Sequence, residues 1–392
     1  MSAAEGIDGE DTQIENFATE NFSAEKIAND SLERQQLAAH LRKIYSAPRE
    51  KWPAPELDPG VEHAELGLPP SPPTGSPGRK PDTPQQQALG KMLFFDPRLS
   101  RSREISCASC HNPDLGWADG LPVAIGRGRR QLRRNTPSVL NTAHLPHFFW
   151  DGRADSYEKQ ALAAITNADE MNSTTELVVE RLSRVQTYVR LFKEAYGDGK
   201  ISIENVLHAL AAFQRTLHSP GTSDFDRFLK GQKNAMSDAA IRGLHLFRTS
   251  ARCMNCHNGP LLTDNQFHDL GLSFFGRSRQ DLGRYEATGK ASDSGKFKTP
   301  GLRNVTKTAP YMHNGLFTLD GVLRLYNAGM PTLRQNENQR DDPLFPKKDP
   351  LLRPLGLSQQ ELEDLKAFLQ SLEDPPRKVP HGQFPPLRDD EE

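Results

Sequence analysis

The stretch CASCH, residues 107–111, returns in closely similar form as CMNCH, residues 253–257. Each motif is a C-x-x-C pair whose second cysteine is followed directly by histidine, and the two motifs use all four cysteines of the chain. Covalent attachment of haem c needs this order, because two thiols add to the haem vinyl groups and the adjacent imidazole binds the iron. The sequence therefore predicts two haem c groups. They would be held by Cys107, Cys110, Cys253 and Cys256, with His111 and His257 as proximal iron ligands.

Other uses of four cysteines fit this sequence less well. A Cys₄ zinc site needs both pairs to converge on one ion and gives the two histidines no role. A thioredoxin-like redox site needs a βαβ setting, which the sequence pattern lacks. A disulfide framework is typical of small secreted domains rather than of a chain of 392 residues. A single C-x-x-C-H motif leaves zinc or redox chemistry open, whereas two motifs that use every cysteine favour haem.

The overall charge bounds the kinds of partner. The chain carries 49 basic and 51 acidic side chains, a formal net charge of -2, which gives no support for binding nucleic acid or anionic membranes. No apolar run approaches the ~20 residues of a membrane span. The polar start MSAAEGIDGEDTQ is not a signal peptide. Because bacteria attach haem c outside the cytoplasmic membrane, we expect a periplasmic protein whose export signal has been removed.

Residues 1–82 are interpreted as an extension without a core of its own. Residues 1–21 are acidic and polar, which predicts a disordered start. Apolar residues recur at helical spacing over 22–45, with Ser23 as a candidate N-cap. The Pro-rich stretches that follow predict an extended strap, which Trp52 would dock onto the body of the protein.

The remainder predicts an all-α fold with long irregular loops. A helix begins after Thr83, with Pro84 at its first position, and alternating strand patterns are nearly absent. Each C-x-x-C-H motif follows a helix of similar character, QALGKMLFF and RGLHLFRTS, which favours two domains related by duplication. Further helical patterns cover 155–165, 174–195, 202–216, 235–248, 318–328 and 358–372. The expected domains are 83–220 and 221–376, followed by a tail over 377–392.

Several blocks of the chain, spread over residues 83–372, resemble a known family. LGKMLFFDPRLSRSREISCASCHNPDLGWADG, RRNTPSVLN, FFWDGRADSYEKQA and FKTPGLRNVTKTAPYMHNGLFT are similar, in this order, to blocks of the bacterial dihaem cytochrome c peroxidase superfamily, including its MauG-like branch. The resemblance implies two cytochrome-c-like helical domains, each with one covalent haem, on either side of a shared interface.

The resemblance gives the N-terminal haem the reaction with hydrogen peroxide. Gln160 and Glu170 match the family's distal glutamine and glutamate, and Glu170 would relay a proton between the two peroxide oxygens. The alternative is a solvated glutamate at a helix boundary. Many relatives carry a histidine before TPS that caps this iron, but the loop AIGRGRRQLRRNTPS, 124–138, has none. We therefore expect an accessible iron, with His144 and His147 as structural residues.

Further residues match the family's interface between the haems. Trp150 matches the tryptophan between the two haems, where it would carry charge from one to the other while also packing in the core. Asn135 and the carbonyl groups of Thr308 and Pro310 match a calcium site, and neutral oxygens suit this hard cation. Arg303 is a candidate partner for a haem propionate.

The second haem needs a sixth ligand if it is to transfer electrons. Most dihaem peroxidases use methionine, and the alignment of FTLDGVLRLYNAGM on the family puts Tyr326 at that position, as in MauG-like members. Met330 lies one helical turn further along and competes with it, and Met312 is a weaker competitor. A neutral thioether raises the haem potential, whereas an anionic phenolate favours ferric and higher states.

The leading functional hypothesis is therefore a dihaem peroxidase of the MauG-like kind. The resemblance implies that peroxide is reduced at the N-terminal haem and that a Tyr-ligated second haem shares the oxidising equivalents. The electron donor would be a small carrier protein, either a cytochrome c or a cupredoxin, or else a residue such as tryptophan on a partner protein. The alternatives are a conventional cytochrome c peroxidase that uses such a carrier, and a dihaem electron-transfer cytochrome without peroxide chemistry.

Overall fold

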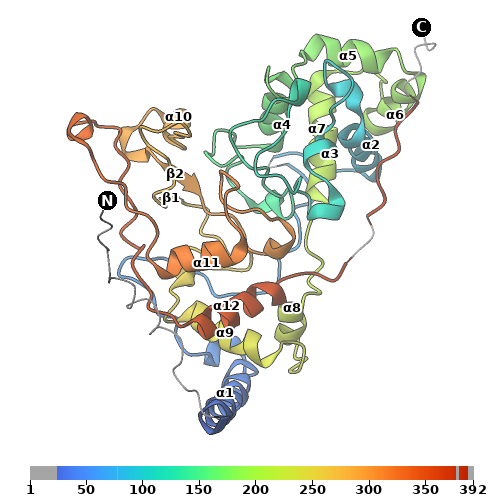
Figure 1. Cartoon of the computed structure of the whole chain (residues 1–392). Coiled ribbons are helices and arrows are strands. Elements are labelled where there is room, and N and C mark those ends of the chain that lie inside the picture. Colours follow the sequence, from blue (N-terminus) through green and yellow to red (C-terminus); the bar gives the residue numbers. More distant parts are fainter. Residues whose placement is uncertain (1–23, 77, 377–378, 387–392) are drawn as a thin grey trace, which may run out of the picture.

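The computed structural model describes residues 24–76, 78–376 and 379–386, and it confirms a mostly helical fold with few strands (Figure 1). The expected disordered start and the cap at Ser23 lie outside the described residues. The helices are α1 (Ala24–Tyr45), α2 (Pro84–Phe95), α3 (Cys107–Cys110), α4 (Tyr157–Thr166), α5 (Thr175–Ser183), α6 (Gln186–Tyr196), α7 (Ile203–Arg215), α8 (Asp224–Leu229), α9 (Asp238–Arg248), α10 (Tyr285–Thr288), α11 (Leu319–Asn327) and α12 (Gln359–Ser371). Strands β1 (Phe267–Asp269) and β2 (Lys296–Lys298) pair antiparallel. Within the described ranges, no helix has the length and apolar character that crossing a membrane requires.

In the first half of the chain, α2 crosses α7 at a glycine. A Cβ atom on Gly90 would lie 1.8 Å from the carbonyl oxygen of Ala209 and 2.9 Å from Cβ of Phe213, so only glycine lets the two backbones approach this closely. The start of α2 is capped as its sequence predicts, because the Thr83 hydroxyl accepts from the backbone N–H of Gln86 and the Gln86 side chain accepts from that of Thr83. The first helix of this half therefore begins at a well-defined position, directly after the Thr83 cap.

The second half repeats this crossing with α9 and α12. A Cβ atom on Gly243 would lie 1.9 Å from the carbonyl oxygen of Asp364 and 2.8 Å from Cβ of Phe368. In both halves the glycine meets a carbonyl group on the partner helix and a phenylalanine one turn later. Figure 1 shows the two helix pairs apart from each other, with α11 between α12 and the strands. The repeated contact supports duplication of one helical unit.

One predicted helix is wrong. The pattern over 174–195 predicts a single helix, whereas the chain forms α5 and α6 with a break at Arg184 and Val185. Val185 has an extended backbone, and its side chain is buried in the core of the first half. Both helices bury apolar residues in that same core, so the apolar spacing continues across the break and does not reveal it.

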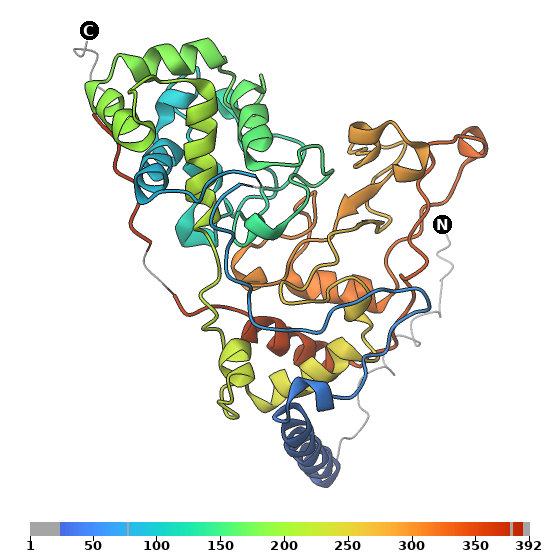
Figure 2. The ribbon, with the colours of Figure 1, turned by 180° about the vertical axis from the view of Figure 1, so that it is seen from behind.

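The N-terminal extension packs on the second half. Helix α1 lies against α9, and the strap runs from there to α2 (Figure 2). Trp52 is 8% exposed and meets Tyr45 edge to face, so it docks the strap as expected. Further along, Asp58 pairs with Arg252, directly beside Cys253. The strap is therefore fixed next to the second C-x-x-C-H motif.

Candidate haem sites

Each C-x-x-C-H motif opens into its own cavity. The two cysteines and the histidine of 107–111 line one cavity, and the corresponding residues of 253–257 line another. The two cavities share a wall that includes Asn135, Trp150 and Lys298. Because the cysteine pairs face different cavities, they do not converge on a single Cys₄ ion.

Both motif histidines are held at Nδ1 by a backbone carbonyl group. His111 Nδ1 lies 3.2 Å from the carbonyl oxygen of Trp117, and His257 Nδ1 lies 3.0 Å from that of Leu262. A carbonyl group only accepts, so each Nδ1 carries the hydrogen and each Nε2 keeps its lone pair. Burial lowers the pKa of both imidazoles, which keeps them neutral. A proximal iron ligand needs this arrangement.

The cysteines also fit haem attachment rather than a thiolate metal site. Burial raises the pKa of the Cys107, Cys110 and Cys253 thiols to about 12. A thioether bond to haem leaves the sulfur neutral, which suits these low-polarity surroundings. The side chains thus suit two covalent haems, one in each cavity.

Glu170 and Gln160 line the first cavity together. Gln160 lies on α4, and Glu170 lies on the turn after this helix. The side-chain amide of Asn167 donates to Glu170 Oε1 at 2.8 Å. Burial raises the pKa of Glu170, although the charge of Arg153 and the Asn167 hydrogen bond oppose this change. A half-buried, hydrogen-bonded carboxyl group of raised pKa suits proton transfer near neutral pH.

The structure places His147 on the first cavity, where sequence reasoning had interpreted it as structural. Its Nδ1 atom is buried and has no hydrogen-bond partner among the described residues. Burial, Arg284 and Lys298 lower the pKa of His147, so the ring is neutral. From the sequence alone, a capping histidine was sought only in loop 124–138, which has none. No local pattern in the sequence marks His147 as a residue that lines the cavity.

Trp150 lies in the shared wall and is held at both ends. Its indole Nε1–H donates to the carbonyl oxygen of Asn135 at 2.9 Å, and its own carbonyl oxygen accepts from the backbone N–H of Lys298 at 2.8 Å. The ring lies 6.4 Å from that of His313. The indole is therefore fixed between the two cavities, where the resemblance implies that it lies between the haems.

The three residues of the expected calcium site also line the second cavity. The side-chain amide of Asn135 donates to the carbonyl oxygen of Leu121 at 2.8 Å, which leaves its Oδ1 atom free to bind a cation. The carbonyl oxygens of Thr308 and Pro310 accept no hydrogen bond from the residues that the structure describes. This set of neutral oxygens fits a hard cation.

Tyr326, on α11, lines the second cavity, whereas Met330 does not. Burial raises the pKa of Tyr326, and Cys256 and Cys253 are the other groups that raise it, so the hydroxyl lies beside the second motif. Met330 is 5% exposed and follows the end of the helix with left-handed backbone. Met312 also lines this cavity, so its position still allows it to compete with Tyr326 as a ligand of the second haem.

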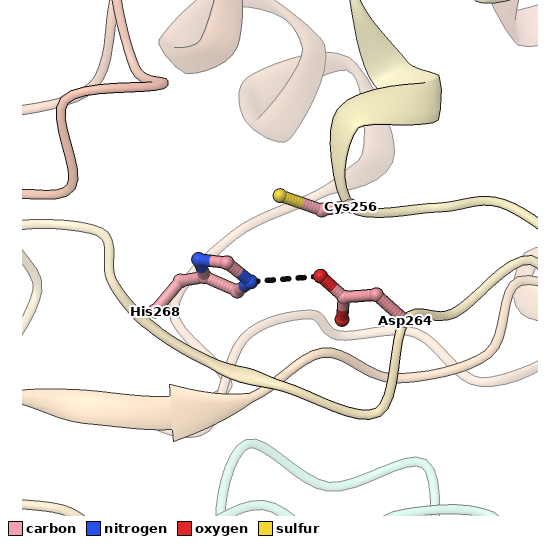
Figure 3. A group of neighbouring side chains, drawn as sticks. All are labelled: Cys256, Asp264 and His268. Carbon is pink, nitrogen blue, oxygen red and sulfur yellow. Dashed lines mark hydrogen bonds and ion pairs between the residues drawn. The ribbon is translucent and has the colours of Figure 1, made fainter. Parts of the chain in front are cut away.

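A cluster of Cys256, Asp264 and His268 lies at the second motif, and sequence reasoning missed it (Figure 3). His268 Nε2 lies 2.9 Å from Asp264 Oδ2, and His268 Nδ1 lies 2.6 Å from Asp349 Oδ2. The two carboxylates raise the pKa of His268 to about 12, so the ring is an imidazolium. Since Cys256 is used for haem attachment, we interpret the cluster as a charged clamp on the haem-binding loop rather than as a metal site.

Arg303, the candidate partner for a haem propionate, lines the second cavity and also makes several contacts within the protein. Its guanidinium group donates to Asp226, at 3.0 Å, and to the carbonyl oxygens of Pro260 and Gly67. These contacts tie the strap to α8 and to the loop after the second motif. Arg303 is therefore already paired within the protein.

Comparison with known proteins identifies relatives over most of the chain. The family model for di-haem cytochrome c peroxidases matches residues 84–234. The methylamine utilization protein MauG of Methylorubrum extorquens is 45% identical over 313 residues, which cover 79% of this chain and 84% of that protein. Cytochrome c551 peroxidase of Nitrosomonas europaea is 39% identical over 236 residues, which cover 60% of this chain and 70% of that protein. The crystal structure of a MauG-like protein associated with microbial copper homeostasis superposes with a TM-score of 0.70 and 31% identity, covering 78% of this chain and 95% of that chain.

Proposed function

The chain belongs to the di-haem cytochrome c peroxidase family, and from this premise we propose that it reduces hydrogen peroxide in the MauG-like manner. The observation that carries the proposal is the contrast between the two cavities, with Gln160 and Glu170 on the first and Tyr326 on the second. When bound, the two haems supply the redox chemistry, taking two oxidising equivalents from peroxide and sharing them between the two sites.

Glu170 is the proton carrier of the proposed reaction. Reduction of H₂O₂ to two waters consumes two electrons and two protons. The Glu170 carboxylate accepts the proton from one peroxide oxygen and delivers it to the other, which leaves as water. Asn167 fixes one carboxylate oxygen through its 2.8 Å hydrogen bond, and Gln160 offers an uncharged donor on the same wall. Together the Glu170 carboxyl group and the Gln160 amide would orient peroxide in the first cavity.

Tyr326 is the proposed sixth ligand at the second site. Its phenol oxygen would bind the haem iron in place of peroxide, and as an anionic ligand it would favour the oxidised state. Trp150 links the sites, because it lines both cavities and its two hydrogen bonds hold it in the shared wall. The proposed division is thus peroxide binding at the first site and charge storage at the second.

The external donor is proposed to be a small redox protein or an oxidisable residue of a partner protein. Both options draw on the same stored equivalents, and the conventional cytochrome c peroxidase is the second candidate. We also propose a periplasmic location, because haem c attachment takes place outside the cytoplasmic membrane in bacteria.

The proposal is tested by adding one equivalent of hydrogen peroxide to the ferric protein as isolated. We expect the spectra of both haems to change without prior reduction, since loop 124–138 has no capping histidine. A reaction that begins only after one haem is reduced would contradict the MauG-like assignment and favour the conventional peroxidase. Rapid turnover with a reduced cytochrome c or cupredoxin would identify a carrier as the donor, whereas slow turnover would favour a partner residue.

A further inference from the structure

Lys298 ends strand β2 and occupies the wall that the two cavities share. Its backbone N–H donates to the carbonyl oxygen of Trp150 at 2.8 Å. Its side chain lines both cavities. Lys298 therefore brings an ammonium group to the one part of the protein that adjoins both haem sites.

The ammonium group of Lys298 has no partner in the described part of the chain. No carboxylate or carbonyl oxygen of the described residues pairs with its Nζ atom, and burial alone lowers its pKa to about 8. Lys296 stands two residues earlier on the same strand and differs, because its Nζ lies 3.6 Å from Asp293 Oδ1. Lys298 is half-buried, and a charge that is partly removed from water is costly without a counter-ion, so such groups are normally paired. Lys298 therefore needs an anion that the described residues do not supply.

A second polar group without a partner lies nearby. His147 lines the first cavity, and its buried Nδ1 atom has no hydrogen-bond partner among the described residues. His147 and Lys298 both line this cavity, and the charge of Lys298 contributes to the lowered pKa of His147. A neutral imidazole can donate one hydrogen bond. The first cavity therefore holds two polar groups, Lys298 and His147, that have no partner among the described residues.

We propose that Lys298 binds a haem propionate at the shared wall and thereby places a positive charge beside both haems. A propionate carboxylate is the acceptor that the ammonium group lacks. Arg303 lines only the second cavity and is already paired with Asp226, so it is not equivalent to Lys298. The inference requires two attached haems but not the peroxide mechanism proposed above.

The consequence concerns the reduction potentials. A nearby positive charge disfavours the more positively charged ferric state and so raises the potential of each haem. Loss of the Lys298 charge should therefore shift both midpoint potentials downwards. A charge that adjoined only one cavity would act mainly on one haem.

The test compares K298M, K298R and the matched control K296M in the haem-loaded full chain. K298M keeps the side-chain length and removes the charge, K298R keeps the charge, and K296M removes a paired charge from the same strand. We expect K298M to lower both midpoint potentials in a spectroscopic redox titration and to shift the propionate bending modes in resonance Raman spectra. K298R and K296M should keep both potentials near those of the unmodified protein.

Three results would overturn the inference. They are unchanged potentials in K298M, a fall confined to one haem, and an equal fall in K296M. If K298M does not retain two haems, K298Q is the second neutral variant, with the same expected shifts and the same contrary results. Since the potentials are measured without peroxide, their outcome is independent of the peroxide reaction.

Discussion

The two halves of the molecule share a scaffold and differ in the walls of their cavities. Each half crosses two helices at a glycine, Gly90 or Gly243, and each holds its motif histidine through Nδ1 and a carbonyl oxygen. The first cavity then carries a buried carboxyl group, Glu170, whereas the second carries a phenol, Tyr326. The comparison suggests one helical scaffold used twice, with a different far wall in each cavity. In the proposed division of labour, the carboxyl group moves protons and the phenol binds iron.

The largest effect on the peroxide reaction is expected from a substitution of Glu170 in the first cavity. Glu170→Gln keeps the shape of the side chain but removes its ability to take up a proton. Because general acid–base catalysis contributes about 10²–10⁴-fold, the rate of the peroxide reaction should fall by this factor in stopped-flow measurements. Glu286→Gln is the matched control, since Glu286 lines the same cavity but pairs with Arg133. Equal rates in the two variants would remove Glu170 from the mechanism.

The pH dependence of the peroxide reaction rate tests the same role of Glu170 as a proton acceptor. Burial raises the pKa of Glu170, and the side chain must be ionised to accept the peroxide proton. The rate should therefore be constant at high pH and fall about tenfold per pH unit below that raised pKa. This acid limb should disappear in Glu170→Gln. An acid limb of the same position in the variant would assign it to another group.

The glycine crossings test whether the two scaffolds are equivalent. Gly90→Ala and Gly243→Ala each push a methyl group against a carbonyl oxygen of the partner helix. Overpacking of this kind costs about 1–3 kcal/mol, so urea unfolding of the haem-loaded protein should show a similar loss of stability for both variants. Gly128→Ala is the control, because a Cβ atom on this exposed glycine has no neighbouring atom within 4 Å. Its left-handed backbone adds only a small strain. A large loss for only one of the two crossings would contradict the equivalence.

The smallest expected effect concerns the proposed calcium site between the halves. A cation that binds only the folded protein adds about 1.4 kcal/mol when its free concentration is roughly ten times its Kd. Removal of calcium with EGTA should therefore lower the midpoint of thermal unfolding, and calcium but not magnesium should restore it. Metal analysis should find one calcium ion per chain. A protein without calcium, whose unfolding is unchanged by EGTA, would rule the site out.

The sequence predicts best where chemistry is local. The two C-x-x-C-H motifs, the Thr83 cap and the helical class follow from residues that stand next to one another. Gln160, Glu170 and Tyr326 needed comparison with a family, because nothing in their own neighbourhoods distinguishes them from surface or core residues.

The remaining features arise from contacts that only folding creates. Asp349 meets His268 across 81 positions of the chain, and no spacing rule links them. Lys298 and His147 become informative only because they line a haem cavity without partners among the described residues, which the sequence does not display. The break between α5 and α6 was missed because Val185 continues the apolar spacing while its backbone leaves the helix.

The spectrum of the second haem in Tyr326→Phe tests the division of labour most directly. The variant removes only the phenol oxygen, and Tyr326→Met replaces it with a neutral thioether. We predict that electron paramagnetic resonance and absorption spectra will show a changed ligand field at the His257 haem in both variants, with the His111 haem unchanged. The Met330→Leu control should leave both haems as they are. An unaltered His257 haem in Tyr326→Phe would contradict the account and make Tyr326 a packing residue.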